Sequence, residues 1–109
     1  MTRIARIVVP GLPHHVTQRG NHRATMFFED GDYALYRDLL AVETKAAHVA
    51  VWARVLMPNH VHLILVPSDE TGLASALGRV HRRYAAYVNA RARRDLPSGA
   101  GKVWLGGDG

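Results

Sequence analysis

The chain has 109 residues, 48% of them hydrophobic, which fits one globular domain, residues 1–109, and excludes a chain that is disordered throughout. Fourteen Lys and Arg residues against nine Asp and Glu give a formal net charge of +5, which favours a polyanionic partner. There is no cysteine, so disulfides and cysteine-ligated zinc are excluded, and no segment reaches the roughly 18 apolar residues of a membrane span. These features predict a soluble cytoplasmic protein without a membrane partner.

The predicted secondary structure follows the order strand, helix, strand, strand, helix and short strand. Runs of β-branched residues indicate strands, and apolar residues that recur every three or four positions indicate helices. The expected elements are a strand over residues 14–19, a helix over 32–47, a β-hairpin over 49–66, a helix over 73–92 and a short strand over 102–105. We expect Asp30 or Asp32 to cap the first helix and Pro58-Asn59 to form the hairpin turn.

Two apolar stripes define the sides of the helices that face the core. The stripes consist of Leu35, Leu39, Val42 and Ala46 in the first helix and of Leu73, Leu77, Val80, Tyr84 and Tyr87 in the second. Together with the element order, they predict an α+β fold of the ferredoxin-like, split βαβ type, with two helices on one face of an antiparallel sheet. The other face of the sheet is then open to a ligand.

The predicted hairpin contains the most informative motif, MPNHVHLIL at residues 57–65. Side chains on a strand alternate between its faces, so His60 and His62 lie on one face, about 7 Å apart along the strand. Two neutral imidazoles at this distance can share a divalent ion, and they suit Mn, Zn, Fe or Cu better than Mg. The alternative is a pair of half-exposed histidines without a ligand. The interruption of an apolar strand by this polar pair is typical of functional sites.

Basic residues concentrate in the second predicted helix and just beyond it. Residues 79–94 contain six of the fourteen basic residues and no acidic residue before Asp95. Arg79, Arg82 and Arg83 lie away from the apolar stripe, so they form a cationic helix face. This face predicts contacts with nucleic-acid phosphates, and a solvated helix surface is the alternative.

A second basic segment, Gln18–Arg23, follows the first predicted strand. It surrounds the flexible Gly20 with Arg19, Asn21 and Arg23, whose side chains can contact a phosphate or a base edge. An ordinary polar turn is the alternative interpretation.

Tyrosine hydroxyls are candidate nucleophiles toward a phosphodiester, and the second helix contains Tyr84 and Tyr87. Both positions fit the apolar stripe of that helix. We therefore expect both rings to pack against the sheet, and we assign neither residue as a nucleophile.

Several stretches of the chain occur in the order of one known family. They are Pro10-Gly11 with HVTQRGN at 15–21, Phe28 with Asp32, MPNHVHLIL, YAAYVN at 84–89 and GKVW at 101–104. In these stretches the chain resembles the REP-associated tyrosine transposases and their insertion-sequence relatives, the single-tyrosine HUH transposases. The resemblance extends from about residue 6 to residue 104, and MPNHVHLIL is its specific element.

This resemblance implies DNA transposition by a ferredoxin-like domain that cleaves and rejoins single-stranded DNA folded into hairpins, through a phosphotyrosine intermediate. It also implies that His60 and His62 hold a divalent metal, Mg or Mn, as a Lewis acid at the scissile phosphate. Single-stranded or hairpin DNA is the implied partner, and a homodimer is a candidate assembly.

The resemblance ends where relatives carry their nucleophile. In those proteins the tyrosine and a further metal ligand lie in a helix after the tryptophan segment, whereas here LGGDG follows Trp104. We therefore expect a domain that stops before the nucleophile-bearing helix and contains no catalytic tyrosine, which leaves enzymatic activity open. Two other functions also stay open. One is a non-catalytic module that binds single-stranded nucleic acid, and the other is a hydrolase in which His60 and His62 activate water.

Overall fold

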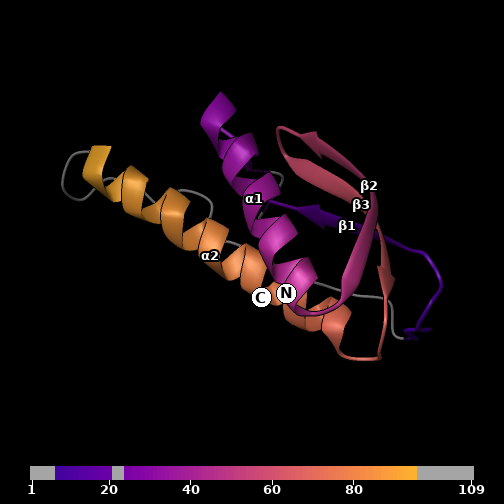
Figure 1. Cartoon of the computed structure of the whole chain (residues 1–109). Coiled ribbons are helices and arrows are strands. Elements are labelled where there is room, and N and C mark those ends of the chain that lie inside the picture. Colours follow the sequence, from indigo (N-terminus) through magenta and orange to yellow (C-terminus); the bar gives the residue numbers. More distant parts are fainter. Residues whose placement is uncertain (1–6, 21–23, 96–109) are drawn as a thin grey trace.

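The structure, a computed structural model, describes residues 7–20 and 24–95. Its elements are β1 (His14–Arg19), α1 (Asp30–Ala46), β2 (Val49–Met57), β3 (His60–Pro67) and α2 (Gly72–Asp95). The strands form one antiparallel sheet, and both helices lie on the same side of it (Figure 1). The α+β class and the predicted order of these five elements are confirmed. The expected short strand at 102–105 lies outside the described residues.

The strand order is β1-β3-β2, with β3 antiparallel to both neighbours. Consequently β1 and β2, which α1 connects, run parallel with a third strand inserted between them. This arrangement is the split βαβ unit that the sequence predicts. The register places Thr17 and Val55 opposite His62, and Arg19 and Met57 opposite His60.

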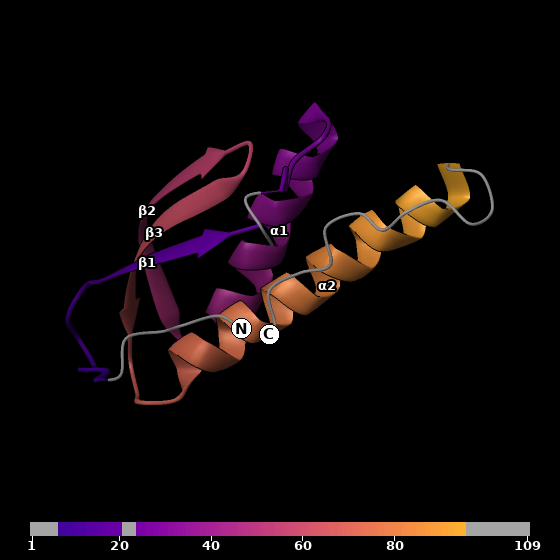
Figure 2. The same cartoon turned by 180° about the vertical axis from the view of Figure 1, so that it is seen from behind.

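The central strand β3 separates a covered face from an open one. Val61, Leu63 and Leu65 are fully buried beneath the helices, and the residues between them are only partly buried. Figure 2 shows the molecule from behind, again with both helices on one side of the sheet. Within residues 7–20 and 24–95, no helix or strand covers the opposite face. We call this surface the open face.

α1 begins at Asp30, and its N-cap is Glu29 rather than the predicted Asp30 or Asp32. Asp32 instead lies in the first turn, where its carboxylate accepts the backbone N–H groups of Phe28 and Glu29 at 2.8 and 3.1 Å. The bond from Glu29 satisfies a donor at the N-cap that the helix start leaves without an intrahelical partner, and the bond from Phe28 fixes the residue before it.

The buried side of α1 differs from the predicted stripe. Its buried residues are Asp32, Tyr36, Leu39, Leu40, Glu43 and Thr44. Val42 is 57% exposed and Ala46 is also exposed, so the prediction was wrong at both positions. Two stripes with helical spacing overlap at Leu39, and the one that includes the large Tyr36 ring faces the core.

In α2 the predicted buried stripe is wrong at one position. Its buried residues include Leu73, Leu77, Val80 and Tyr84, as predicted, but Tyr87 is 42% exposed and Val88 is buried instead. After Tyr84, the buried stripe continues four residues later, at Val88, rather than three residues later, at Tyr87. None of the described helices is long and apolar enough to cross a membrane.

The first turn of α2 lies close to the end of α1. A Cβ at Gly72 would be only 2.8 Å from the carbonyl oxygen of Ala47, so this approach requires glycine. Asp69 accepts the backbone N–H groups of Thr71 and Gly72 at 3.0 and 2.7 Å and thereby caps the helix.

Candidate metal and nucleic-acid site on the open sheet face

β3 presents His60 and His62 on the open face, because Val61 between them points into the core. Their ring centroids are 4.8 Å apart and their planes are nearly perpendicular, at 83°. Both rings are partly exposed. The two imidazoles therefore lie side by side on a surface that a ligand can reach.

Each ring is held through its Nδ1 atom. His60 Nδ1 lies 2.7 Å from Oδ1 of Asn59, and His62 Nδ1 lies 3.1 Å from Nε2 of His15 and 3.3 Å from Oγ1 of Thr17. Among the described residues, neither Nε2 atom has a hydrogen-bond partner. In metal-binding histidines one ring nitrogen typically donates to a neighbouring group while the other binds the ion. The chemistry of this pair therefore fits a divalent cation.

Among the described residues, the pair is not part of a larger set of metal ligands. In the part of the chain that the structure describes, no group of three or more His, Asp and Glu side chains could hold a metal ion. A cation at His60 and His62 would therefore need further ligands from outside the described residues, such as water or a substrate.

Three effects lower the pKa of His60: its partial burial on the sheet and the positive charges of Arg19 and His62. The lowered pKa favours the neutral ring, and only an unprotonated nitrogen can bind a metal ion.

Arg19 is the predicted DNA contact that the structure places beside the histidines. It is exposed and lies opposite His60 in the register of β1 and β3, so the two side chains share the open face. The backbone N–H of Gly20 donates to Asn59 O at 3.1 Å and so connects the end of β1 to the hairpin turn. Asn21 and Arg23 lie outside the described residues.

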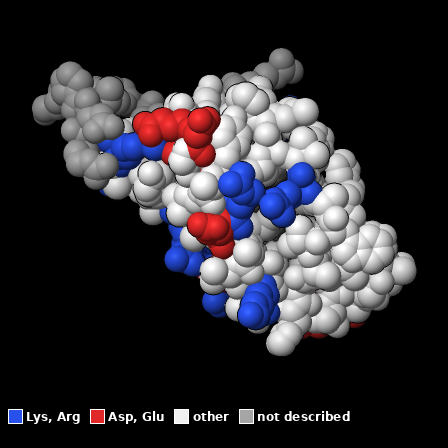
Figure 3. Space-filling model, turned by 45° about the horizontal axis from the view of Figure 1, so that its top comes forward, with Lys and Arg blue, Asp and Glu red and all other residues white. Residues whose placement is uncertain are grey.

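Arg79, Arg82 and Arg83 belong to the helix layer, so the sheet separates them from His60 and His62. Arg83 donates to Glu43 of α1 at 2.8 Å, and the guanidinium of Arg82 lies against Gly78 of its own helix. On the face in Figure 3, acidic side chains occur among the basic ones. The structure therefore does not bring these arginines together with the histidine pair.

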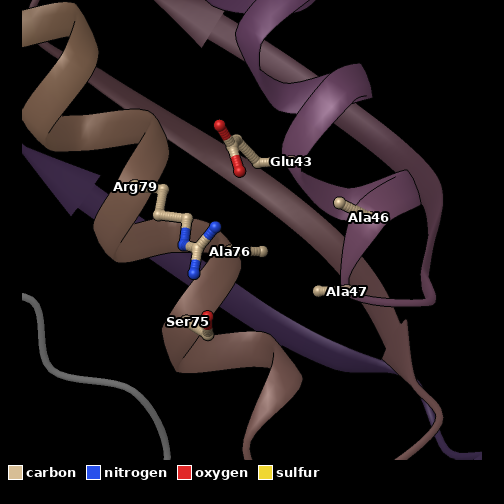
Figure 4. Close-up of a pocket in the computed structure, with 6 residues that line it drawn as sticks. All are labelled: Glu43, Ala46, Ala47, Ser75, Ala76 and Arg79. Atoms are coloured by element: carbon tan, nitrogen blue, oxygen red, sulfur yellow. The ribbon is translucent and has the colours of Figure 1, made fainter.

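A notch between α1 and α2 contains Arg79. Figure 4 shows its lining, which consists of Glu43, Ala46, Ala47, Ser75, Ala76 and Arg79. Its volume is about 90 Å³, whereas pockets for small molecules usually measure about 300–1,000 Å³. The notch is too small for a nucleotide, so the open face remains the candidate site.

Two of the four tyrosine hydroxyls are bonded in the core. Tyr36 OH lies 2.9 Å from Nε2 of the buried His81, and Tyr84 OH donates to Met26 O at 2.6 Å. Burial raises the pKa of both phenols, so they are poor nucleophiles. Tyr87, expected in the core, is instead 42% exposed, with its ring centroid 5.3 Å from the Arg91 guanidinium.

Comparison with solved structures places this fold among transposases. A REP-associated tyrosine transposase bound to a REP hairpin matches with a TM-score of 0.64 and 17% identity, over 95% of this chain and 57% of that one. A candidate transposase from Deinococcus radiodurans R1 matches with a TM-score of 0.60 and 22% identity, over 94% of this chain and 78% of that one.

No protein-family model and no curated protein matches the sequence. The structural neighbours agree with the resemblance found in the sequence, and they show that the chain has the fold of these transposases. The chain spans little more than half the length of the hairpin-bound neighbour, 57%.

Proposed function

We propose that this chain is a transposase-like domain that binds single-stranded, hairpin-forming DNA on the open face of its sheet. The observation that carries the proposal is the placement of His60, His62 and Arg19 together on that face. The neighbouring structure with a bound REP hairpin supports DNA as the ligand, since it has the same fold. The formal net charge of +5 favours the same class of partner.

Each residue of the site has a role in this proposal. The Nε2 atoms of His60 and His62 bind a divalent cation, Mg²⁺ or Mn²⁺, and Asn59 holds the first ring through its Nδ1 atom. When bound, the cation acts as a Lewis acid on a phosphate oxygen. Arg19 contacts the DNA backbone beside it, because a guanidinium can donate two hydrogen bonds to one phosphate.

Strand cleavage and rejoining through a phosphotyrosine is the chemistry that the family resemblance implies. Tyr36 and Tyr84 cannot supply the nucleophile in this packing, because their hydroxyls are buried and bonded. The ring of Tyr87 is 42% exposed and Tyr33 is partly exposed, so Tyr87→Phe tests the more exposed of the two remaining tyrosines.

The test combines binding and cleavage on one substrate, an end-labelled single-stranded DNA hairpin with Mn²⁺. We expect the double variant His60→Ala/His62→Ala to lose Mn²⁺-dependent binding, whereas His48→Asn removes an exposed histidine elsewhere and keeps it. His48 has φ 58°, which asparagine tolerates, so this control preserves the turn. Equal binding by all three proteins would contradict the proposed site.

Denaturing gels of the same reactions test the chemistry separately. A covalent protein–DNA band that disappears in Tyr87→Phe would make this residue the nucleophile and would overturn our assignment of no catalytic tyrosine. Binding without a covalent band agrees with that assignment.

The second candidate function is a non-catalytic module for single-stranded nucleic acid. The burial of the Tyr36 and Tyr84 hydroxyls favours it, since cleavage through a phosphotyrosine needs an accessible phenol. This function predicts steeply salt-dependent binding that does not change when His60 and His62 are replaced. The double variant therefore distinguishes the two functions.

A homodimer stays a prediction. β2 is an edge strand of the described sheet, and Trp52 and Val55 on it are 64% and 50% exposed. Exposed apolar edges favour self-association. Light scattering during size-exclusion chromatography, repeated over a range of protein concentrations, measures whether the chain forms dimers.

A further inference from the structure

The open face contains a third histidine, His15, on β1. It lies two residues before Thr17, which pairs with His62, so strand alternation places its side chain on the same face. Nε2 of His15 is 3.1 Å from Nδ1 of His62, and the two ring planes are within 7° of parallel. The motif in β3 gives no indication of this contact, which depends on the pairing of β1 with β3.

Two imidazole nitrogens at this distance share one proton in a hydrogen bond, so one nitrogen donates and the other accepts. When His62 carries its proton on Nδ1, His15 accepts, and Nε2 of His62 keeps a free lone pair. With the proton on Nε2, that atom of His62 could not bind a cation. Nε2 of His62 can therefore bind a cation only in the arrangement in which Nδ1 of His62 donates and Nε2 of His15 accepts.

Nδ1 of His60 also contacts a polar neighbour, but the partner is a different one. Oδ1 of Asn59 lies 2.7 Å from Nδ1 of His60, and an amide oxygen can only accept. His60 therefore donates from Nδ1 and keeps Nε2 free. Thr17 Oγ1, at 3.3 Å from Nδ1 of His62, can donate or accept, and so can Nε2 of His15 at 3.1 Å, so neither contact alone fixes the proton on Nδ1.

We propose that His15 is a positioning residue that accepts a hydrogen bond from Nδ1 of His62 and so directs Nε2 of His62 toward a divalent cation. The effect of His15 on metal binding rests on the proposed function. The hydrogen bond between His15 and His62 and the position of the proton on His62 do not. His15 is exposed and is not one of the buried residues of the apolar core.

The first measurement is the protonation site of His62 in the metal-free protein. Long-range ¹⁵N–¹H correlation NMR at about pH 8, where ordinary histidines are neutral, distinguishes a proton on Nδ1 from one on Nε2. We expect Nδ1–H in the wild type, a shift toward Nε2–H in His15→Ala, and recovery of Nδ1–H in His15→Gln, whose amide oxygen can accept. Thr17→Val is the matched control, and it should leave Nδ1–H in place.

The second measurement is Mn²⁺ affinity of the same four proteins by calorimetry. Loss of a group that orients a ligand usually weakens metal binding about 10- to 100-fold, so we expect that loss in His15→Ala and its recovery in His15→Gln. A loss in His15→Ala that His15→Gln restores supports the positioning role, since a general loss of structure would not be rescued.

The two measurements test separate claims, the role of His15 and the proposed binding of a cation. A proton on Nε2 of His62 in the wild type, or no change in His15→Ala, would overturn the role of His15. If the proton moves as expected but the wild type binds no Mn²⁺, the hydrogen bond stands and the proposed function fails.

Discussion

The two faces of β3 differ although they share one backbone. Toward the helices, Val61, Leu63 and Leu65 are completely buried and form part of one apolar core. Toward the open face, His60 and His62 are partly exposed and are held by polar neighbours through one nitrogen each. The covered face thus contributes to the apolar core, whereas the open face leaves the two histidine rings within reach of a ligand.

Polar groups show the same contrast. In the helix layer, Asp32 is fully buried, and Arg91 donates to its two carboxylate oxygens at 2.6 and 2.9 Å. On the open face, the Nε2 atoms of His60 and His62 have no partner among the described residues. Polar groups that stabilise the domain are thus satisfied within it, and those of the site keep one atom free. Substitutions on the two sides should therefore have separable effects.

The largest expected loss of stability follows from Asp32→Ala. The variant leaves the Arg91 side chain, only 13% exposed, with the carboxylate of Glu29 at 3.8 Å as its remaining ion-pair partner and removes the acceptor of two backbone N–H groups. Removing one partner of a buried ion pair costs about 3–5 kcal/mol, and chemical denaturation measures the loss. Asp38→Ala, at an exposed position of the same helix, should change stability by less than about 0.5 kcal/mol. Similar losses in both variants would contradict the contrast between satisfied core groups and surface groups.

Leu63→Ala and Ile64→Ala compare neighbouring positions on opposite faces of β3. Leu63 is completely buried, so its truncation should cost about 3 kcal/mol, including the cavity that it leaves. Ile64 is only partly buried, and its truncation should cost about 1 kcal/mol. Denaturation midpoints of both variants measure the difference. Equal losses would mean that the open face is covered in solution.

Acid should remove the contribution of the Asp32–Arg91 pair. Burial alone would raise the pKa of Asp32, but hydrogen bonds from Arg91, Phe28 and Glu29 together lower it below the ordinary 3.8. The contribution is therefore present above the unfolded-state pKa and is lost as the pH falls through the lower folded-state value. The stability difference between wild type and Asp32→Ala should stay level from about pH 7 to 5 and shrink below about pH 4. A difference that grows on acidification would show that the pKa shift has the opposite sign.

The smallest expected effect is a change of about tenfold in DNA affinity. It is measured by comparing a substitution of Arg19 in the sheet with a substitution of Arg82 in the helix layer. Arg19→Gln removes a charge beside the histidines and should weaken binding of a DNA hairpin about tenfold, with a salt dependence reduced by about one phosphate contact. Arg82→Gln removes the same charge from the helix layer and should weaken binding less. Fluorescence anisotropy across a salt series measures both. Equal losses would indicate DNA that contacts both layers.

The sequence predicts the element order because strand and helix periodicities are local properties of the chain. The hairpin turn at Pro58-Asn59 and the shared face of His60 and His62 follow from the same local rules. By contrast, the buried side of α1 is ambiguous, since Leu35 and Tyr36 start two stripes with equally good helical spacing. Only packing against the sheet selects the stripe with Tyr36, and packing likewise selects Val88 rather than Tyr87 in α2.

Contacts between distant segments could not be predicted from these local patterns. The cationic character assigned to α2 overlooks Glu43, which lies in α1 and binds Arg83. His15 and His62 are 47 positions apart in the chain, and their contact depends on the register of β1 against β3. A search for histidines at alternating positions of both predicted strands would have identified His15 as a neighbour of the site.

The most direct test of the account is an NMR titration of the ¹⁵N-labelled protein with Mn²⁺, followed by addition of the DNA hairpin. Bound Mn²⁺ broadens the signals of nearby amides. We expect the broadening to be strongest at His60, His62 and the paired residues of β1, and we expect the DNA then to shift the signals of Arg19 and its neighbours. Broadening centred on the helix layer, or no selective broadening at the open face, would contradict a metal site formed by the two histidines.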